Sequence, residues 1–197
     1  MNKAKELSSP IDKAVFDYNL IEKGDRILIG ASGGKDSTAL LEYFSARTKR
    51  KDCDFEYKAL FIKNDFAPEF PEGIKMLLDE WNVPFEQIDV NTLERVKDGH
   101  KMNCWWCSTQ RRTELLRYAM ANGYNKIIRP LCYVTEARLI EHAVAGGYAG
   151  FTCTCNYQDN SGRKAARVKL EALTDGDEAK KKRLLVSLKN IKPLYLL

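Results

Sequence analysis

The chain has 197 residues, of which 44% are hydrophobic and 30% are charged, and its net charge at neutral pH is +5. These values are typical of a soluble globular protein with one α/β domain, or with one domain and a small appendage. No apolar run is long enough to span a bilayer, and the first ten residues lack a signal-peptide core. We therefore expect a cytoplasmic protein with no membrane partner.

Short apolar strands alternate with amphipathic helices along the chain. One helix directly follows the first strand, and two more are predicted at 68–81 and 108–122. Such alternation favours a parallel sheet with helices on both faces, a Rossmann-like α/β fold, here in a single domain over residues 1–197. The predicted strands occupy residues 26–30, 57–62, 84–90 and 125–128.

The chain departs from this pattern after the fourth predicted strand. A parallel sheet normally needs a crossover of about a dozen residues before its next strand. Here residues 125–128 run directly into Arg129, Pro130 and Leu131. Either the sheet ends at this strand, or a connecting segment is missing from the sequence.

Positive charge is concentrated in a basic extension at the C-terminus. Residues 161–197 carry ten Lys and Arg against four Asp and Glu, a balance of +6, whereas the first 160 residues sum to −1. A solvated helix face would explain this excess, and so would a surface that contacts nucleic-acid phosphates. Charge alone does not decide between the two.

A dense cluster of small polar residues, SGGKDS at Ser32–Ser37, lies between the first strand and the first helix. Backbone N–H groups at a helix N-terminus form an anion site, and glycine lets them approach a phosphate closely. Lys35 adds a positive charge, and the serine hydroxyls can bond phosphate oxygens. Asp36 repels phosphate, so we expect it to cap the helix or to act through a bridging Mg²⁺.

This segment resembles the SGGxDS signature of the PP-loop ATP pyrophosphatase superfamily, whose fold is of the adenine nucleotide alpha hydrolase type. The resemblance implies an enzyme that uses ATP to adenylate a carbonyl oxygen and releases pyrophosphate, after which a nitrogen or sulfur nucleophile displaces AMP. It also implies that the pyrophosphate part of ATP is held by Ser32, Gly33, Gly34, Lys35, Asp36 and Ser37.

Three cysteines suggest metal or redox chemistry. Cys104 and Cys107 form a CxxC pair directly before the predicted helix at 108–122, and a helix N-terminus stabilises thiolates. Cys155 follows about fifty residues later. Together they suit a zinc ion with a fourth ligand, for which His100 and Cys153 are candidates, or an iron–sulfur cluster with one open iron.

Two other pairs of residues carry weaker signals. Cys53 and Cys132 are expected to be buried, unreactive thiols. Asn64 and Asp65 follow the second predicted strand. Because the carboxyl ends of parallel strands line the ligand crevice, these two residues are expected either to contact adenosine or to form a plain turn.

Within the superfamily, the chain resembles the tRNA two-thiolation enzymes, and most closely the tRNA two-thiocytidine synthetases. This resemblance implies an ATP-dependent sulfurtransferase that adenylates the two-position carbonyl oxygen of a tRNA pyrimidine and replaces that oxygen with sulfur. It rests on four pieces in the same order: the SGGKDS loop, the CxxC pair followed by Ser108 and Arg111-Arg112, the RPLCYV segment at 129–134, and Cys155 before Gln158-Asp159-Asn160.

The resemblance also implies roles for individual residues. Cys104, Cys107 and Cys155 would ligate a [4Fe–4S] cluster whose open iron carries the sulfur, and the two CxxC cysteines with Asp36 would be catalytic. ATP and Mg²⁺ would be the other cofactors, tRNA and a sulfur donor (a persulfide carrier or sulfide) the partners, and the oligomer a homodimer. The expected tRNA-contacting residues are Arg111, Arg112, Arg163, Lys164, Arg167, Lys181, Lys182 and Arg183.

One feature of the family pattern has no counterpart in this chain. A Gly-His-x-x-Asp-Asp stretch follows the fourth strand in the family, whereas here Ile128 is joined directly to Arg129. Two other functions stay open on sequence grounds. One is a sulfur transferase of the superfamily that acts on a small molecule, and the other is a zinc-stabilised RNA-binding module without catalysis.

Overall fold

The computed structural model describes residues 4–51, 53–65, 68–96, 103–150 and 162–187. Of Cys104, Arg163 and Lys164 it describes the backbone only. The chain divides into two compact units, Met1–Cys155 and Asn156–Leu197. The first unit carries the SGGKDS loop and the CxxC pair, and the second carries the basic extension.

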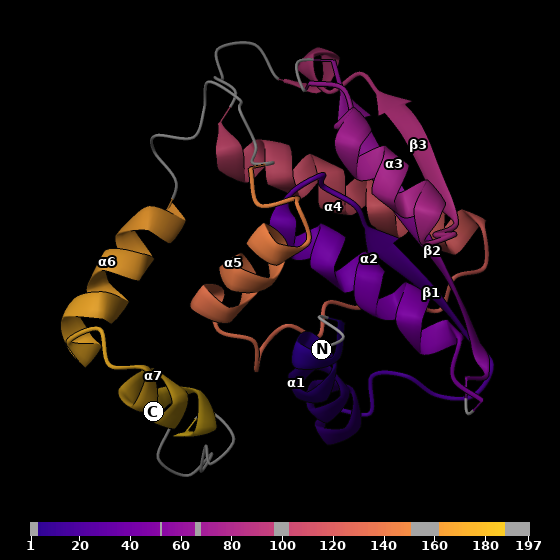
Figure 1. Ribbon diagram of the computed structural model, residues 1–197. Helices are drawn as coiled ribbons and strands as arrows, with labels where there is room; N and C mark the ends of the chain where they lie inside the picture. The colour runs from indigo at the N-terminus through magenta and orange to yellow at the C-terminus, as the bar shows by residue number, and fades with distance from the viewer. Residues whose placement is uncertain (1–3, 52, 66–67, 97–102, 151–161, 188–197) are drawn as a thin grey trace, which may run out of the picture. The chain divides into compact units, whose positions relative to one another are not determined.

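The first unit is built on one parallel sheet with the strand order β3-β2-β1-β4 (Figure 1). All four strands lie where the sequence predicts them, and β2 is longer at both ends. Because β2 and β4 flank β1 on opposite sides, the order reverses between β1 and β4, and ligands of open α/β sheets bind at such a point. The strands are β1 Asp25–Gly30, β2 Phe55–Asn64, β3 Phe85–Val90 and β4 Lys126–Ile127.

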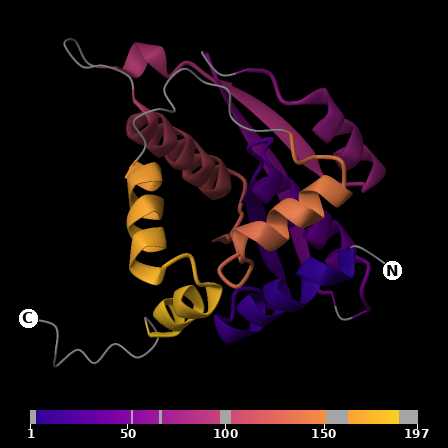
Figure 2. The ribbon, with the colours of Figure 1, turned by 60° about the vertical axis from the view of Figure 1, so that its left-hand side comes forward.

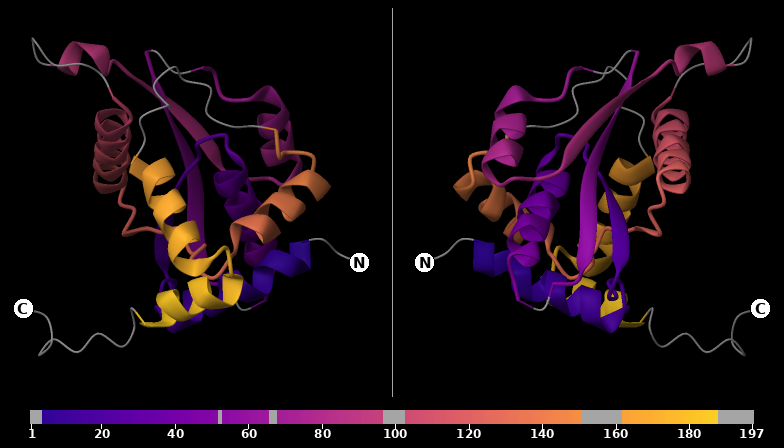
Figure 3. Two further views of the ribbon diagram at one scale, coloured as in Figure 1. Left: turned by 90° about the vertical axis from the view of Figure 1, so that its left-hand side faces the viewer. Right: turned by 90° about the vertical axis from the view of Figure 1, so that its right-hand side faces the viewer.

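Helices cover both faces of this sheet, as predicted (Figure 3). One face carries α4, Cys104–Ala121, which contacts β1, β2 and β4. On the other face α5 packs against α2 (Figure 2), and α1 contacts both of them. The helices of this second face are α1 Ala4–Asp17, α2 Lys35–Thr48, α3 Glu72–Glu80 and α5 Glu136–Ala145.

The strands divide their side chains between two cores, because successive residues of a strand point to opposite faces. Leu28, Leu60 and Ile62 pack with Ala119 under α4. Residues of the opposite parity, such as Ile27 and Phe61, join the larger core under α1, α2, α3 and α5. Even-numbered residues of β2 therefore point toward α4, and odd-numbered ones point toward the helices on the opposite face.

Two helix boundaries differ from their predicted positions for local reasons. The predicted helix at 108–122 begins earlier, at Cys104, because the Asn103 side chain caps it by accepting a hydrogen bond from the Trp106 backbone N–H at 2.9 Å. The helix predicted at 68–81 begins later, at Glu72, because Pro71 is its N-cap, with an extended backbone. The CxxC pair consequently lies inside the first turn of α4 rather than before the helix.

The sheet of the described residues ends at β4, which has two residues and pairs only with β1. From there the chain passes through 128–134 to Thr135, whose hydroxyl caps α5 by accepting from the Arg138 N–H. Within the described residues no strand follows β4, which fits both alternatives for this junction.

The described residues of the second unit, 162–187, form the helices α6 Gly162–Thr174 and α7 Glu178–Ser187. Lys181 of α7 pairs with Glu171 of α6 at 2.7 Å and with Glu178 of its own helix at 2.9 Å. In the part of the chain that the structure describes, no helix is both long enough and apolar enough to cross a membrane.

Candidate functional site

The SGGKDS loop leaves the carboxyl end of β1 and turns directly into α2. Gly33 has a φ of +71°, a conformation that L side chains rarely adopt, and a Cβ there would lie 2.7 Å from the Pro71 Cδ. Gly34 is the N-cap of α2 and has no side chain with which to cap that helix end. Glycine at position 33 therefore allows the tight turn of the loop, and the Gly34 N–H, at the positive end of the helix, donates to the Ser32 Oγ at 3.4 Å.

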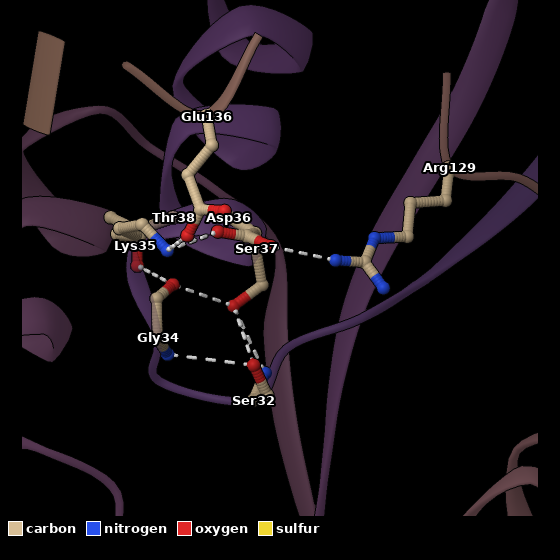
Figure 4. A network of polar contacts seen from close by, with 8 residues as sticks. All are labelled: Ser32, Gly34, Lys35, Asp36, Ser37, Thr38, Arg129 and Glu136. Carbon is tan, nitrogen blue, oxygen red and sulfur yellow. Dashed lines mark hydrogen bonds and ion pairs between the residues drawn. The ribbon is translucent and has the colours of Figure 1, made fainter. Parts of the chain in front are cut away.

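Hydroxyl groups fix the shape of this loop (Figure 4). The Ser37 Oγ accepts a hydrogen bond from the Ser32 N–H at 3.1 Å and donates to the Gly34 carbonyl at 3.0 Å. It also lies 3.0 Å from the Ser32 Oγ. The Thr38 hydroxyl donates to the same Gly34 carbonyl at 3.1 Å. These bonds hold the loop open before any ligand arrives, which lowers the entropy that binding loses.

Four charged side chains lie together at the loop (Figure 4). Two belong to the loop itself, and two come from distant parts of the chain. The Lys35 Nζ lies 3.1 Å from an Asp36 carboxylate oxygen and 3.6 Å from one of Glu136. Arg129, which follows β4, donates to the other Asp36 oxygen at 2.8 Å. Arg129 and Glu136 were not predicted as site residues. The signal for Arg129 was its place at the carboxyl end of a strand next to β1.

The two cations suit phosphate oxygens, and the two carboxylates suit Mg²⁺. The described residues contain no group of three or more His, Cys, Asp or Glu side chains that could hold a metal ion alone. A Mg²⁺ ion usually binds one or two carboxylates and completes its shell with substrate phosphates and water. Asp36 and Glu136 fit that role, because both lie within reach of a phosphate bound at the loop.

A buried contact holds α5, and with it Glu136, against the loop helix α2. The Glu42 carboxylate of α2 accepts a hydrogen bond from the Tyr148 hydroxyl at 2.9 Å and lies 2.8 Å from the His142 Nε2 of α5. Tyr148 and His142 are buried, and burial together with the Glu42 charge raises the pKa of the Tyr148 hydroxyl. The hydroxyl therefore stays a donor at neutral pH and keeps the two helices in register.

The second feature of the site is the CxxC pair. Cys104 and Cys107 lie in the first turn of α4, where the helix dipole favours thiolates. Cys107 is buried, and its Sγ lies 3.4 Å from the amide nitrogen of Asn64 at the end of β2. This amide contact was not predicted from the sequence.

The other cysteines divide into three cases. Cys155, the third predicted ligand, lies outside the described residues, as do Cys153 and His100. Cys53 is half-buried. Cys132 is exposed. The expectation that Cys132 is a buried thiol is wrong, because it lies in the short connection between β4 and α5 rather than in an element that packs on the core.

Asp65 forms the turn after β2. Its carboxylate accepts from the Thr92 hydroxyl at 2.7 Å and from the Leu93 N–H at 2.9 Å. Burial on its own raises the pKa of this carboxyl, but the bonds from Thr92 and Leu93 outweigh it, so the pKa lies below its usual value. Of the two predicted roles, the plain turn fits Asp65.

The predicted tRNA-contacting residues lie on three helices. On α4, Arg111 is half-buried, and the exposed Arg112 donates to the Ser108 carbonyl at 3.1 Å. Lys181 is 21% exposed and engaged with two glutamates, which leaves it less available than its neighbours. The remaining described side chains of the set are exposed and belong to α6 and α7, namely Arg167, Lys182 and Arg183.

The fold and the loop together define the class of this protein. A parallel sheet covered on both faces, with SGGKDS between its first strand and the following helix, is the PP-loop ATP pyrophosphatase fold that the sequence predicts. Two solved structures share this fold. The U34-tRNA thiolase NcsA from Methanococcus maripaludis, solved with its [4Fe-4S] cluster, matches 95% of this chain and 79% of its own at a TM-score of 0.77 and 14% identity. An NH3-dependent NAD synthetase from Campylobacter jejuni matches 96% of this chain and 93% of its own, at a TM-score of 0.53 and 14% identity.

Sequence relatives narrow the class. The tRNA-cytidine(32) 2-sulfurtransferase of Legionella pneumophila (strain Paris) is 28% identical over 238 aligned positions, which cover 98% of this chain and 83% of the relative. The enzyme of that name from Shewanella sediminis is 27% identical over 239 aligned positions, which cover 98% of this chain and 75% of the relative. Both alignments are longer than this chain, so each relative contains residues that have no counterpart here. No family model matches the chain. The predicted resemblance to the tRNA two-thiocytidine synthetases is confirmed by these relatives.

Proposed function

We propose that the protein is an ATP-dependent tRNA sulfurtransferase that replaces the two-position oxygen of a tRNA cytidine with sulfur. One observation carries this proposal: the SGGKDS loop and the CxxC pair lie at the carboxyl ends of neighbouring strands of one sheet, β1 and β2. An ATP site and a thiol site would therefore lie at the same carboxyl end of the sheet. Relatives named tRNA-cytidine(32) 2-sulfurtransferase support the choice of substrate.

The loop residues bind and orient ATP. Backbone N–H groups of Gly33 and Gly34 and the Lys35 ammonium receive the phosphates that leave as pyrophosphate. Arg129 can exchange its bond to Asp36 for a phosphate oxygen, and the carboxylates of Asp36 and Glu136 would hold a Mg²⁺ ion that neutralises phosphate charge. The base carbonyl oxygen attacks the α-phosphorus, and the bond from phosphorus to pyrophosphate breaks.

The cysteines serve the second half of the reaction. Cys104 and Cys107 would hold a [4Fe–4S] cluster with Cys155, and such a cluster with three protein ligands supplies an open iron that can carry sulfur. A buried thiol at a helix N-terminus fits this ligand role. Sulfur forms a bond to the adenylated carbon, and the carbon–oxygen bond breaks so that AMP leaves with the former base oxygen.

The basic residues hold the tRNA backbone. Arg112 lies on the same helix as the cysteines, little more than one turn beyond Cys107, where it can reach a phosphate next to the reacting base. We propose that Arg111 on α4 contacts tRNA phosphates as well, and that α6 and α7 of the second unit contribute their own phosphate contacts through Arg163, Lys164, Arg167, Lys181, Lys182 and Arg183. We further propose a persulfide carrier or sulfide as the sulfur donor, a homodimer as the assembly, and the cytoplasm as the location.

Metal content tests the cysteine half of this proposal. Iron, acid-labile sulfide and zinc would be measured per chain after anaerobic purification of the wild type, of Cys104→Ala and Cys107→Ala, and of Cys132→Ala as a control for an exposed thiol. We expect about four iron and four sulfide per chain, lost in the first two variants and kept in the control. Zinc without sulfide would overturn the sulfurtransferase proposal in favour of a zinc-stabilised RNA-binding module.

Pyrophosphate release tests the ATP half. The wild type should release pyrophosphate from ATP in a reaction that needs tRNA, and Lys35→Ala should lose this activity. Release that proceeds equally well without tRNA would instead indicate a small-molecule substrate.

A further inference from the structure

Asn64 occupies an unusual position for a polar residue. It is the last residue of β2 and is 1% exposed. Its Nδ2 lies 3.4 Å from the Cys107 Sγ, and its Oδ1 is buried without a hydrogen-bond partner among the described residues. A buried amide that lacks one of its bonds destabilises a fold, so an apolar side chain would serve packing better at this position.

The direction of the Asn64 side chain follows from the register of β2. Asn64 has the same parity as Leu60 and Ile62, which pack under α4, and its side chain therefore points to the face that α4 covers. Cys107 lies one turn into α4 on that face. The extension of β2 beyond the end of β1, whose Gly30 pairs with Leu60, carries the amide out to the first turn of the helix.

A role in the local turn does not explain Asn64. The next residue, Asp65, already fixes this turn through its bonds to Thr92 and Leu93. The N–H of the Asn64 amide contacts the sulfur instead. A thiolate sulfur accepts such a hydrogen bond, whereas a carboxamide oxygen in the same place would be repelled by it.

We propose that Asn64 is a positioning residue for the cysteine site: it donates an N–H hydrogen bond to the Cys107 sulfur when that sulfur is a cluster ligand. The inference rests on the proposed function, because it takes Cys107 to bind the cluster. Hydrogen bonds to ligand sulfurs stabilise the more negative, reduced state of an iron–sulfur cluster. Loss of the amide should therefore make the cluster harder to reduce.

The test compares midpoint potentials of anaerobically purified wild type, Asn64→Ser and Asn64→Leu, measured by redox titration with electron paramagnetic resonance detection. The serine is too short to reach the sulfur, and the leucine fills the space without a donor. We expect the ratio of reduced to oxidised cluster at a fixed potential to fall about tenfold in both variants, which is about 59 mV for a one-electron couple. Asn125→Ser is the matched control, because that amide donates to Asp25 at 2.8 Å, at the opposite end of β1.

The outcomes separate this inference from the proposed function. A lower potential in both Asn64 variants and an unchanged one in the control would support the inference, as would loss of the cluster from variants that melt at the control's temperature. Potentials equal to that of the wild type would overturn it and leave the sulfurtransferase proposal standing. A wild type without iron and sulfide would overturn the proposed function itself.

Discussion

Alanine at Gly33 should destabilise the protein more than alanine at any glycine where only the backbone conformation matters. A non-glycine residue in the left-handed region costs about 1–2 kcal/mol. The new Cβ would also lie 2.7 Å from the Pro71 Cδ, closer than real Cβ atoms approach, and such overpacking costs about 1–3 kcal/mol more. The sum is about 2–5 kcal/mol for Gly33→Ala. Gly24 has a φ of +79° and nothing within 4 Å of its Cβ position, so Gly24→Ala should lose only the first amount.

Urea unfolding of both variants measures this difference, since the free energy of unfolding extrapolates linearly with denaturant. Pro71→Ala, alone and combined with Gly33→Ala, completes a double-mutant cycle. Removal of the proline ring should recover about 1–3 kcal/mol in the Gly33→Ala background, because the clash with the new methyl group is then relieved. Equal losses in Gly33→Ala and Gly24→Ala would refute the close approach of the α3 N-cap to the loop.

Three further changes probe the surroundings of the site. Tyr148→Phe removes one hydrogen bond to the Glu42 carboxylate and should lower the free energy of unfolding by about 1.5–3 kcal/mol, as measured with urea; no change would show that α5 does not depend on this bond. The lowered pKa of Asp65 stabilises the fold above the unfolded-state pKa of 3.8, and this stabilisation is lost as the pH falls through the folded-state pKa. In Asp65→Asn the free energy of unfolding should therefore depend less steeply on pH below about pH 4. An unchanged pH dependence would contradict this. Because we propose that Arg129 contacts a phosphate of ATP, Arg129→Ala should weaken ATP binding about 10- to 100-fold, as measured by calorimetry. Arg26→Ala, at the opposite end of β1, should leave this affinity unchanged, and equal affinities of the two variants would exclude Arg129 from the site.

Local sequence patterns predicted much of this fold because each pattern is resolved within a few residues. Alternation and apolar runs located all four strands, and the glycines marked the loop at its place after β1. The predicted start of α4 is four residues too late, because hydrophobic periodicity does not show that Asn103 is the N-cap of the helix. Capping depends on a single residue and is easily missed when periodicity is the guide.

The charges around the loop could not be predicted in this way. Arg129 is 93 residues from Asp36 in the chain, and their contact exists only because β4 pairs with β1 and delivers its carboxyl end to the loop. Glu136 reaches Lys35 because Glu42 and His142 hold α5 on α2. Contacts of this kind depend on strand order and helix packing, which a single sequence does not encode locally.

The unequal lengths of β1 and β2 explain how the SGGKDS loop and the first turn of α4 both come to lie at the carboxyl end of the sheet. β1 ends at Gly30, opposite Leu60, and the chain turns there to form the SGGKDS loop on the face of α2. β2 continues four residues further, roughly 13 Å at the rise of a strand, and ends at Asn64 under the first turn of α4. The loop and the first turn of the cysteine helix thus lie on opposite faces of the sheet, and both lie at the carboxyl end of its strands. In the proposed reaction, a substrate base held at this carboxyl end of the sheet would meet ATP from one face and sulfur from the other.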